Sequence, residues 1–182
     1  MAAFLGVPEA EDTQPGTFIF IATRLSDGVA VGTCRLKTNF YEPTEFETNI
    51  ALPDSFQQRL LAQGTRLAVI AGSDTMLVTK LLLKAVHQFC SGFQVAHVLV
   101  AAEPPRDRFY RAFGFREIFS GKRFLIASAP GHECAILSFE FRKSAELLEK
   151  NPEHTRFFLQ TYCPDIQIFS SLFASWVTPR QR

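Results

Sequence analysis

The strongest constraint on the fold is a run of three patterns, in which an apolar stretch, an amphipathic stretch and a second apolar stretch follow one another. Residues 65–71 (TRLAVIA) and 95–101 are short apolar runs typical of buried strands. Between them, residues 76–90 carry apolar side chains every three or four positions, as on one helix face. Polar residues at 72–75 and a glycine at Gly92 mark the ends of that helix. Strands joined through one helix run parallel with a right-handed crossover, so the sequence predicts a central βαβ unit.

Strand patterns also precede this unit. Residues 17–24 and 29–36 are rich in β-branched and aromatic side chains, and Ser26-Asp27-Gly28 between them is a typical turn sequence. These runs predict an antiparallel hairpin. Residues 39–63 contain prolines and polar residues, and we expect them to connect the hairpin to the unit with a short helix at 54–62.

Shorter elements follow the unit. Pro104-Pro105 and Gly114 bracket a short helical segment. The elements expected here are a helix at 106–113, strands at 115–119 and 135–141, and helices at 144–149 and 152–163. Together with the hairpin, they predict an α/β fold with a central mixed β-sheet, an antiparallel N-terminal hairpin and the βαβ unit.

Length and composition place these elements in a single domain. A chain of 182 residues is long enough for one well-buried core and short for two. We expect residues 1–16 to form a flexible N-terminal arm, residues 17–142 to form the domain, and residues 143–182 to form a helical extension packed on it. The 19 phenylalanines suit either a phenylalanine-rich core or a channel for a fatty chain, and composition does not separate the two.

The sequence disfavours several classes of partner. A formal net charge of +1 argues against a nucleic-acid partner. No apolar run approaches the roughly 20 residues that span a bilayer, and the acidic N-terminus is unlike a signal peptide, so we expect a cytoplasmic protein without a membrane span. The scattered cysteines and the isolated run His132-Glu133-Cys134 lack metal-ligand spacing, so we expect reduced thiols and no metal.

The start of the central helix has the layout of an anion site. Residues 71–76 join a strand to a helix, where free backbone amides and the positive end of the helix dipole meet a negatively charged group. Further along lies the hexapeptide Tyr110-Arg111-Ala112-Phe113-Gly114-Phe115. This order of elements, together with the Tyr-x-x-x-Gly-Phe motif, resembles the Gcn5-related N-acetyltransferase (GNAT) superfamily over about residues 17–141.

The resemblance implies a donor site and a catalytic acid. In that superfamily the strand–helix loop holds the pyrophosphate of coenzyme A, and the tyrosine that matches Tyr110 often protonates the departing thiolate. A phenol beside a thioester sulfur can make that proton transfer, although Tyr110 could equally be an aromatic residue packed between helix and sheet. The implied co-substrate is acyl-CoA or another acyl-phosphopantetheine thioester. The matching donor-binding residues here are Leu67, Val69, Ala71, Gly72, Ser73, Thr75, Met76 and Leu77.

The donor loop departs from the usual superfamily pattern. Asp74 brings a negative charge towards the phosphates, and residues 74–79 lack the glycines that let phosphates approach the backbone. By contrast, Gly64-Thr65-Arg66-Leu67-Ala68-Val69 resembles the Ser-Arg-x-x-Val strand of long-chain N-acyl amino acid synthases and acyl-homoserine-lactone synthases. Those relatives take the acyl chain from acyl carrier protein, which presents phosphopantetheine without the adenosine pyrophosphate. The resemblance therefore favours a longer acyl thioester, with acyl carrier protein as a partner.

Other polar residues are candidates for substrate binding and proton transfer. Arg66 could hold an acidic substrate group or simply pair locally. Glu47, with Glu45, is the nearest candidate for a general base, because residues 65–71 contain no Asp, Glu or His. A basic cluster near Tyr110 could receive an acidic carrier protein or be a solvated charged face; its members are Arg106, Arg108, Arg111, Arg116, Lys122 and Arg123.

Two functional hypotheses follow from the sequence. The first is an N-acyltransferase that moves an acyl group from a phosphopantetheine thioester to the amine of a small molecule such as an amino acid. The second is a GNAT-like domain that has lost catalysis and serves as a ligand-binding or protein-interaction module. Residues 1–16 are too short to supply the helices that build the acceptor site in the superfamily. Either residues 143–182 replace that wall, or a second subunit does in a homodimer, or the acceptor site is lost.

Overall fold

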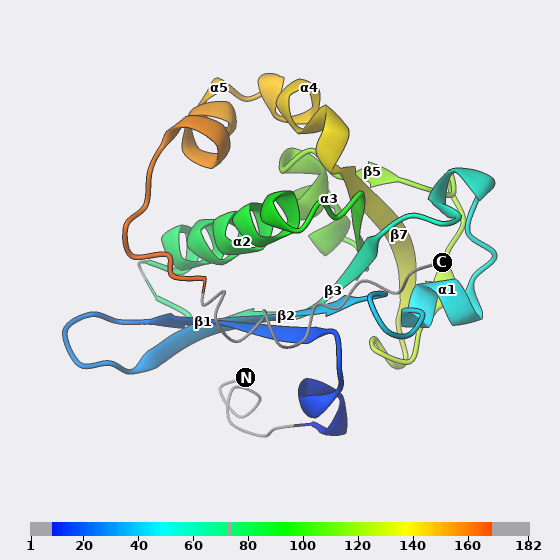
Figure 1. Cartoon of the computed structure of the whole chain (residues 1–182), viewed down its shortest axis with the longest axis horizontal. Coiled ribbons are helices and arrows are strands. Elements are labelled where there is room, and N and C mark those ends of the chain that lie inside the picture. Colours follow the sequence, from blue (N-terminus) through cyan, green and yellow to red (C-terminus); the bar gives the residue numbers. More distant parts are fainter. Residues whose placement is uncertain (1–8, 73, 169–182) are drawn as a thin grey trace.

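A seven-stranded mixed β-sheet forms the frame of the protein in the computed structural model (Figure 1), which describes residues 9–72 and 74–168. The strands follow the spatial order β1-β2-β3-β4-β7-β5, and β6 pairs with β7 beside this path. Their bounds are Thr17–Thr23 (β1), Ala30–Thr38 (β2), Leu61–Val69 (β3), His97–Ala102 (β4), Arg116–Glu117 (β5), Phe124–Leu125 (β6) and Glu133–Glu140 (β7). Among the described strands, β3 and β4 form the only parallel pair, as expected for two strands joined through one helix.

Helices lie on both faces of the sheet. Their bounds are Glu45–Asn49 (α1), Thr75–Gly92 (α2), Arg106–Ala112 (α3), Ser144–Glu149 (α4) and Pro152–Thr155 (α5). α5 continues directly into a π-helical turn at Arg156–Gln160. Figure 1 shows α2 lying along the sheet, with α4 and α5 beyond it on the same side. We refer to Ser144–Gln160 as the C-terminal wall.

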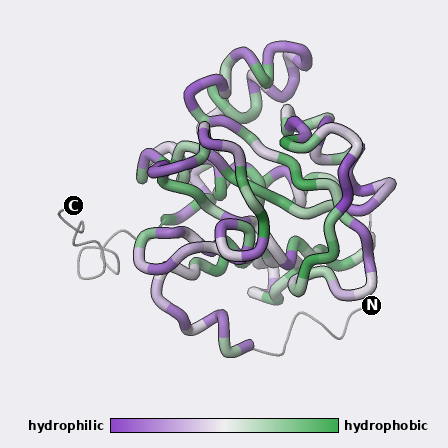
Figure 2. The backbone as a smooth tube through the Cα atoms, turned by 90° about the vertical axis from the view of Figure 1, so that its right-hand side faces the viewer, coloured by the Kyte–Doolittle hydropathy of each residue, from purple (hydrophilic) through white to green (hydrophobic). Residues whose placement is uncertain are grey.

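The central strands contribute to two apolar clusters, because successive side chains of a strand point to opposite faces. The cluster on the α2 side includes Leu36, Ala62, Phe89 and Val98. The cluster on the α1 side includes Phe46, Leu61, Leu99 and Ile136. Figure 2 shows hydrophobic segments gathered in the interior and hydrophilic ones in the outer turns. Because β4 and β7 are buried on both faces, their sequences are largely apolar.

β3 changes its pairing along its length. It pairs with β4 only as far as Gly64 and Val100, although β3 continues to Val69 and β4 to Ala102. Its register against β2 also shifts in this region, and Arg66 has a φ of 52°, a left-handed conformation found at bulges. The two parallel strands therefore share a ladder in their first half and separate beyond Gly64.

The hairpin, α2 and β4 lie close to their predicted positions, whereas β3 begins at Leu61 and ends at Val69 instead of spanning the predicted 65–71. The helix predicted at 54–62 is wrong, because only Asp54–Phe56 forms a 3-10 turn and β3 already begins at Leu61. Leu61 pairs with β4, and Ala62 pairs with both β2 and β4. This tertiary pairing outweighs the helical spacing of their side chains.

Other differences concern the ends of elements. The strand predicted at 115–119 is reduced to Arg116–Glu117, and the helix predicted at 152–163 ends at Gln160. The sequence patterns do not predict α1 or β6. Residues 169–182, the end of the expected helical extension, lie outside the described residues.

The segment before β1 contacts the sheet through Arg35, a buried side chain of β2. Its guanidinium forms ion pairs with Glu9 at 2.9 Å, with Glu11 at 2.7 Å and with Asp12 at 3.0 Å. The division of the chain into arm, domain and extension remains a prediction. These ion pairs attach the part of the arm that the structure describes to the sheet.

Candidate active site

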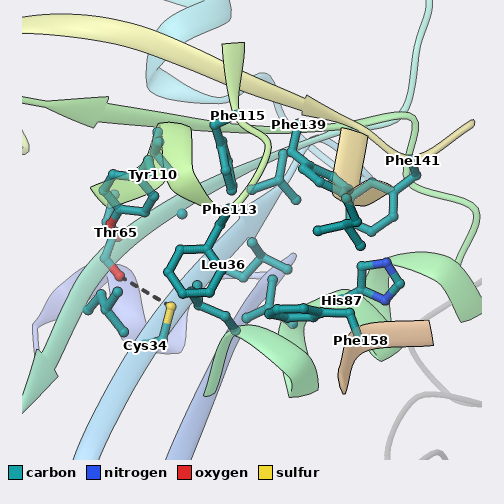
Figure 3. A pocket seen from close by; sticks show the side chains of 17 residues that line it. Cys34, Leu36, Thr65, His87, Tyr110, Phe113, Phe115, Phe139, Phe141 and Phe158 are labelled. Atoms are coloured by element: carbon teal, nitrogen blue, oxygen red, sulfur yellow. Dashed lines mark hydrogen bonds between the residues drawn. The ribbon is translucent and has the colours of Figure 1, made fainter. Parts of the chain in front are cut away.

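A cavity with a volume of about 50 Å³ lies between α2 and the sheet (Figure 3). β2, β3, β4 and β7 form its floor, α2 covers it, and α3 and the C-terminal wall close its sides. The lining includes five phenylalanines, and its aliphatic side chains include Leu36, Leu83, Val86, Val98 and Leu148. The cavity therefore suits an apolar ligand.

Four of the side chains that line the cavity carry polar groups: Cys34, Thr65, His87 and Tyr110. Figure 3 shows Tyr110, Thr65 and Cys34 together at one end and His87 at the other. No carboxylate lines the cavity in the part of the chain that the structure describes. The cavity thus has a polar end beside β3 and an apolar length that leads to one imidazole.

Tyr110 is half-buried on α3, where the rings of Phe109 and Phe115 pack against it at centroid distances of 5.3 and 5.4 Å. Burial raises the pKa of its phenol, and the neighbouring Cys34 raises it further. A phenol with a raised pKa stays protonated at neutral pH, so it can donate a proton but does not act as a base. This protonation state fits the role of general acid that the resemblance implies.

The turn after α3 fixes the direction of the rings on either side of it. Gly114 has a φ of +88°, which side chains rarely adopt, and a Cβ there would lie 3.1 Å from the carbonyl oxygen of Leu147. The glycine therefore allows α3 to end sharply while α4 approaches closely. Phe113 and Phe115, on either side of it, both line the cavity.

Cys34 forms part of the same end of the cavity. Its thiol lies 3.9 Å from the carbonyl oxygen of Thr65, to which it can donate a weak hydrogen bond. Burial raises the pKa of this thiol to about 12. The thiolate is the nucleophilic form, and a thiol with a raised pKa stays protonated. Cys34 therefore lines the cavity and does not serve as an acyl acceptor. All four cysteines of the chain are free thiols.

The predicted donor loop lies at the carboxyl end of β3, where α2 begins. The Thr75 hydroxyl accepts a hydrogen bond from the Gly72 N–H at 2.9 Å and donates to the Gly72 carbonyl oxygen at 2.8 Å. Asp74 takes the N-cap position of α2. The loop is therefore closed by its own threonine and carries an acidic residue at the helix start, while Ser73 lies outside the described residues.

The other predicted donor-binding residues divide into two groups. Leu67 lines the cavity, and Val69 is half-buried at the end of β3. Ala71, Met76 and Leu77 are exposed to solvent. The predicted set thus runs from the interior of the cavity to the surface beside the start of α2.

Glu47 lies away from the cavity. Its carboxylate accepts hydrogen bonds from the Thr44 N–H at 2.8 Å, from the Thr44 hydroxyl at 2.9 Å and from the Asn39 amide at 2.8 Å. It thereby forms the capping box of α1, which packs on the opposite face of the sheet from Tyr110. Glu45 accepts a hydrogen bond from Gln63 at 3.0 Å, so it is also engaged there.

Arg66, the predicted substrate-binding residue, lies on the bulge of β3 with its side chain partly exposed. Its guanidinium pairs with the carboxylate of Glu9. A carboxylate from the chain itself therefore lies where the sequence predicts an acidic substrate group, and an acidic acceptor has to compete with it.

The basic cluster around α3 is interleaved with acidic residues. Arg111 and Arg123 both pair with Glu117, at 2.6 and 2.7 Å. Further ion pairs join Arg106 to Glu103 at 3.8 Å and Arg116 to Glu146 at 3.6 Å. These pairs favour a solvated face of mixed charge over a uniform basic patch.

His87 is a candidate that the sequence patterns do not single out. It follows Leu83 by one helical turn on α2, so both side chains face the cavity. Its Nε2 is buried and has no hydrogen-bond partner among the described residues. Burial, and to a lesser extent the charge of Lys84, lowers the pKa of His87 to about 4, so the imidazole is neutral at pH 7. Helical spacing alone could have placed this histidine towards the interior.

Lys84 connects α2 to the C-terminal wall. It is fully buried, and its ammonium donates hydrogen bonds to the carbonyl oxygens of Phe157 and of Thr161, the latter at 2.6 Å. The ammonium also lies 4.8 Å from the centroid of the Phe157 ring. These carbonyls lie at the end of the helical segment that begins with α5, where a positive charge is favourable.

Comparison with known proteins identifies this arrangement at the level of the fold. The sequence matches no family model, and no curated protein matches it. FeeM, an N-acyl amino acid synthase from uncultured soil microbes, matches with a TM-score of 0.64 at 15% identity, over 75% of this chain and 79% of FeeM. The chain has the GNAT fold. The GNAT fold is also matched by MesI, a CoA-dependent acyl-homoserine lactone synthase, with a TM-score of 0.58 at 17% identity over 86% of this chain and 75% of MesI. TofI, solved in a ternary complex with an inhibitor and MTA, matches with a TM-score of 0.51 at 14% identity over 76% and 72% of the two chains.

In this GNAT fold, the cavity lies beside the point where β3 and β4 separate, because Gly64, Leu67 and Val100 all line it. No helix within residues 9–72 and 74–168 is long and apolar enough to cross a membrane. The same residues contain no group of three or more His, Cys, Asp or Glu side chains that could hold a metal ion. His132 instead pairs with Glu103 at 2.6 Å.

Proposed function

We propose that the protein is an N-acyltransferase that moves an acyl group from a phosphopantetheine thioester to the amine of a small molecule such as an amino acid. The observation that carries this proposal is the apolar cavity with the protonated phenol of Tyr110 at its polar end. The GNAT fold supports it, because FeeM, an N-acyl amino acid synthase, and MesI, a CoA-dependent acyl-homoserine lactone synthase, share that fold.

In the proposed reaction the acyl chain lies in the cavity, with the thioester at the end that carries Tyr110. The acceptor amine attacks the thioester carbonyl carbon, a C–N bond forms, and the C–S bond breaks. The departing sulfur takes the phenolic proton of Tyr110, the amine proton passes to solvent, and the Tyr110 phenolate regains a proton from solvent. Backbone N–H groups of the bulged part of β3 are suited to stabilise the carbonyl oxygen, because β4 has left that edge of the strand.

The proposed donor is acyl-phosphopantetheine presented by acyl carrier protein or by coenzyme A. The closed loop at Gly72–Thr75 and the negative charge of Asp74 favour a donor without a pyrophosphate at this position. A cavity of roughly 10–15 Å³ holds one water molecule by the same measure, so the space between α2 and the sheet accommodates a chain of a few carbons. We expect a longer chain to displace the C-terminal wall outward.

A second candidate function is an acyl-binding module without turnover. It is favoured by the absence of a carboxylate among the described cavity residues and by the engagement of Glu47 in the cap of α1. This alternative shares the donor site with the first proposal and differs from it only in product formation.

One experiment separates these functions. The purified protein is titrated with S-decanoyl-pantetheine, decanoyl-CoA and decanoyl acyl carrier protein, and then incubated with each donor and an amino acid mixture for mass spectrometry. We expect a higher melting temperature with the acylated donors than with their free thiols, and N-decanoyl amino acids as products. Binding without product supports the module, and no shift with any donor contradicts both functions.

A further inference from the structure

We infer that His87 selects an acyl chain that carries a hydroxyl group away from its thioester end, by a hydrogen bond formed inside the cavity. This inference rests on the proposed function, because it concerns the chain that the same cavity is proposed to hold.

Three phenylalanine rings pack around His87. Its ring lies 6.1 Å from the ring of Phe139, 5.3 Å from that of Phe141 and 5.9 Å from that of Phe158, measured between centroids. These rings come from β7, from the residue that follows it and from the C-terminal wall. The nearest charge, on Lys84 of the same helix, is already bonded to two backbone carbonyl oxygens.

A buried nitrogen without a partner is unfavourable, and a ligand that supplies the missing hydrogen bond gains what the empty site lacks. Nε2 of His87 is in this state, and it lies at the wall of a cavity that is otherwise apolar at that end. The methylene groups of an acyl chain can pack against the phenylalanine rings, but they cannot form a hydrogen bond with this nitrogen. A polar substituent on the chain can form that hydrogen bond while the rest of the chain packs against the rings.

The chemistry of a neutral imidazole points to a hydroxyl as that substituent. Burial keeps His87 neutral at pH 7, so Nε2 is either a donor or an acceptor according to the tautomer. A hydroxyl can serve either tautomer, whereas a ketone can only accept. A carboxylate would bring an unpaired charge into an apolar cavity, which is costly.

The position of the hydroxyl follows from the two ends of the cavity. Tyr110 and Thr65 lie at one end and His87 at the other, as Figure 3 shows. With the thioester at the Tyr110 end, the carbon that reaches His87 is several bonds along the chain. A hydroxyl on the carbon next to the thioester therefore does not reach it.

The test is a binding experiment with S-acyl-pantetheine probes, which both proposed donor types share. Calorimetry compares S-hexanoyl-pantetheine with isomers that carry one hydroxyl at successive carbons of the same chain, because the cavity accommodates only a chain of a few carbons. We expect one isomer to bind the wild-type protein about tenfold more tightly than the unsubstituted probe, the gain typical of one satisfied buried hydrogen bond. The advantage should disappear in His87→Leu and return in part in His87→Gln, whose amide reaches the position of Nε2.

His97→Leu is the matched control, because His97 is a partly buried histidine on the opposite face of the sheet, 3.1 Å from the Ser138 hydroxyl. It should leave the preference unchanged. If the unsubstituted probe binds and no hydroxylated isomer binds more tightly, the inference about His87 is overturned and the proposed function stands. If the advantage persists in His87→Leu, another group selects the hydroxyl and the inference is likewise overturned. If no probe binds at all, the proposed function is overturned together with the inference.

Discussion

Among single residues, Tyr110 combines a reactive group with a position that keeps the group protonated. Its ring is held by Phe109 and Phe115, and burial raises the pKa of the phenol. Removal of the hydroxyl alone in Tyr110→Phe keeps the ring contacts. We expect turnover to fall by roughly 10²–10⁴-fold, as for loss of a general acid, with little change in melting temperature. Steady-state kinetics with a decanoyl donor measure this, and unchanged turnover would remove Tyr110 from the mechanism.

The lowered pKa of His87 leads to a separate prediction about how the free energy of unfolding depends on pH. Its pKa is about 4 in the folded protein and has its ordinary value of 6.5 in the unfolded chain, so the unfolded chain binds more protons between these values. Stability from this residue is therefore complete above about pH 6.5 and is lost as the pH falls towards 4, by on the order of 3 kcal/mol. Urea unfolding from pH 7 to pH 4 should show a shallower loss in His87→Leu than in the wild type.

The pKa values of His97 and His154 are also lowered by burial, so part of the pH dependence should remain in His87→Leu. Between pH 7 and pH 4, His97→Leu is the comparison variant, because it removes a different histidine whose pKa is also lowered. Equal slopes for the wild type and for His87→Leu would mean that His87 is not buried as a neutral group.

The candidate residues differ in how far their sequence context reveals them. Tyr110 stands in a motif, so sequence alone predicts its place on the helix after β4. Glu47 stands in Thr44-x-x-Glu47, which is a capping pattern, and its structural role there takes it away from the cavity. The unpartnered Nε2 of His87 depends on rings from β7 and the C-terminal wall, which no local pattern brings together.

Among the elements, α2 carries the donor loop at one end and holds the C-terminal wall near its middle. Lys84→Met removes the ammonium and leaves the carbonyl oxygens of Phe157 and Thr161 without this donor. We expect a loss of roughly 1–3 kcal/mol in the free energy of unfolding, together with faster amide exchange near these residues. Lys80→Met, on the same helix and partly buried, is the control. Protection that is equal in both variants would show that Lys84 does not hold the wall.

The negative charge of Asp74 at the start of α2 leads to a prediction about donor affinity. Asp74→Asn removes a negative charge while keeping a side chain that is favourable at an N-cap. We expect decanoyl-CoA, which carries a pyrophosphate, to bind a few-fold more tightly, and S-decanoyl-pantetheine to bind as before. Calorimetric titration of both donors measures the difference. An equal change for the two donors would mean that the pyrophosphate does not lie near Asp74.

Long elements with a clear period were predictable, and short ones were not. The pattern at 76–90 is long enough to specify α2, whereas Leu61 and Ala62 fit a helix as well as a strand until their neighbours are known. The two-residue strands depend on pairing with β7 rather than on their own sequences, whereas the capping pattern Thr44-x-x-Glu47 could have predicted α1. The bulge at Arg66 was not predictable, because an arginine occupies the left-handed backbone conformation that a glycine usually marks.

In the whole molecule, the described end of the N-terminal arm is held to the sheet by Arg35. Arg35→Met leaves three partly exposed carboxylates without their shared partner. Because those carboxylates can be solvated, we expect a modest loss of about 1–2 kcal/mol and faster proteolysis near residues 9–16. Arg24→Met, which removes the exposed ion pair with Asp27, is the control. Proteolysis as slow as in the wild type would contradict this role for Arg35.

The mixed sheet was predictable, because the order of strand and helix patterns specifies the connections, and the resemblance of that order and of the Tyr110–Phe115 motif to the superfamily implied the GNAT fold. The cavity was not, because its lining comes from segments between Cys34 and Phe158 that only the folded chain brings together. Composition left open whether the phenylalanines form a core or a channel. In the folded chain, Phe139 and Phe158 belong to a buried cluster and also line the cavity.

One side of the cavity comes from a single contiguous part of the chain. The sheet supplies the floor and α2 the cover, whereas Leu148 and Phe158 both come from the C-terminal wall, Ser144–Gln160. Substitutions confined to Ser144–Gln160 can therefore reshape one side of the cavity without altering its polar end, where Tyr110, Thr65 and Cys34 lie.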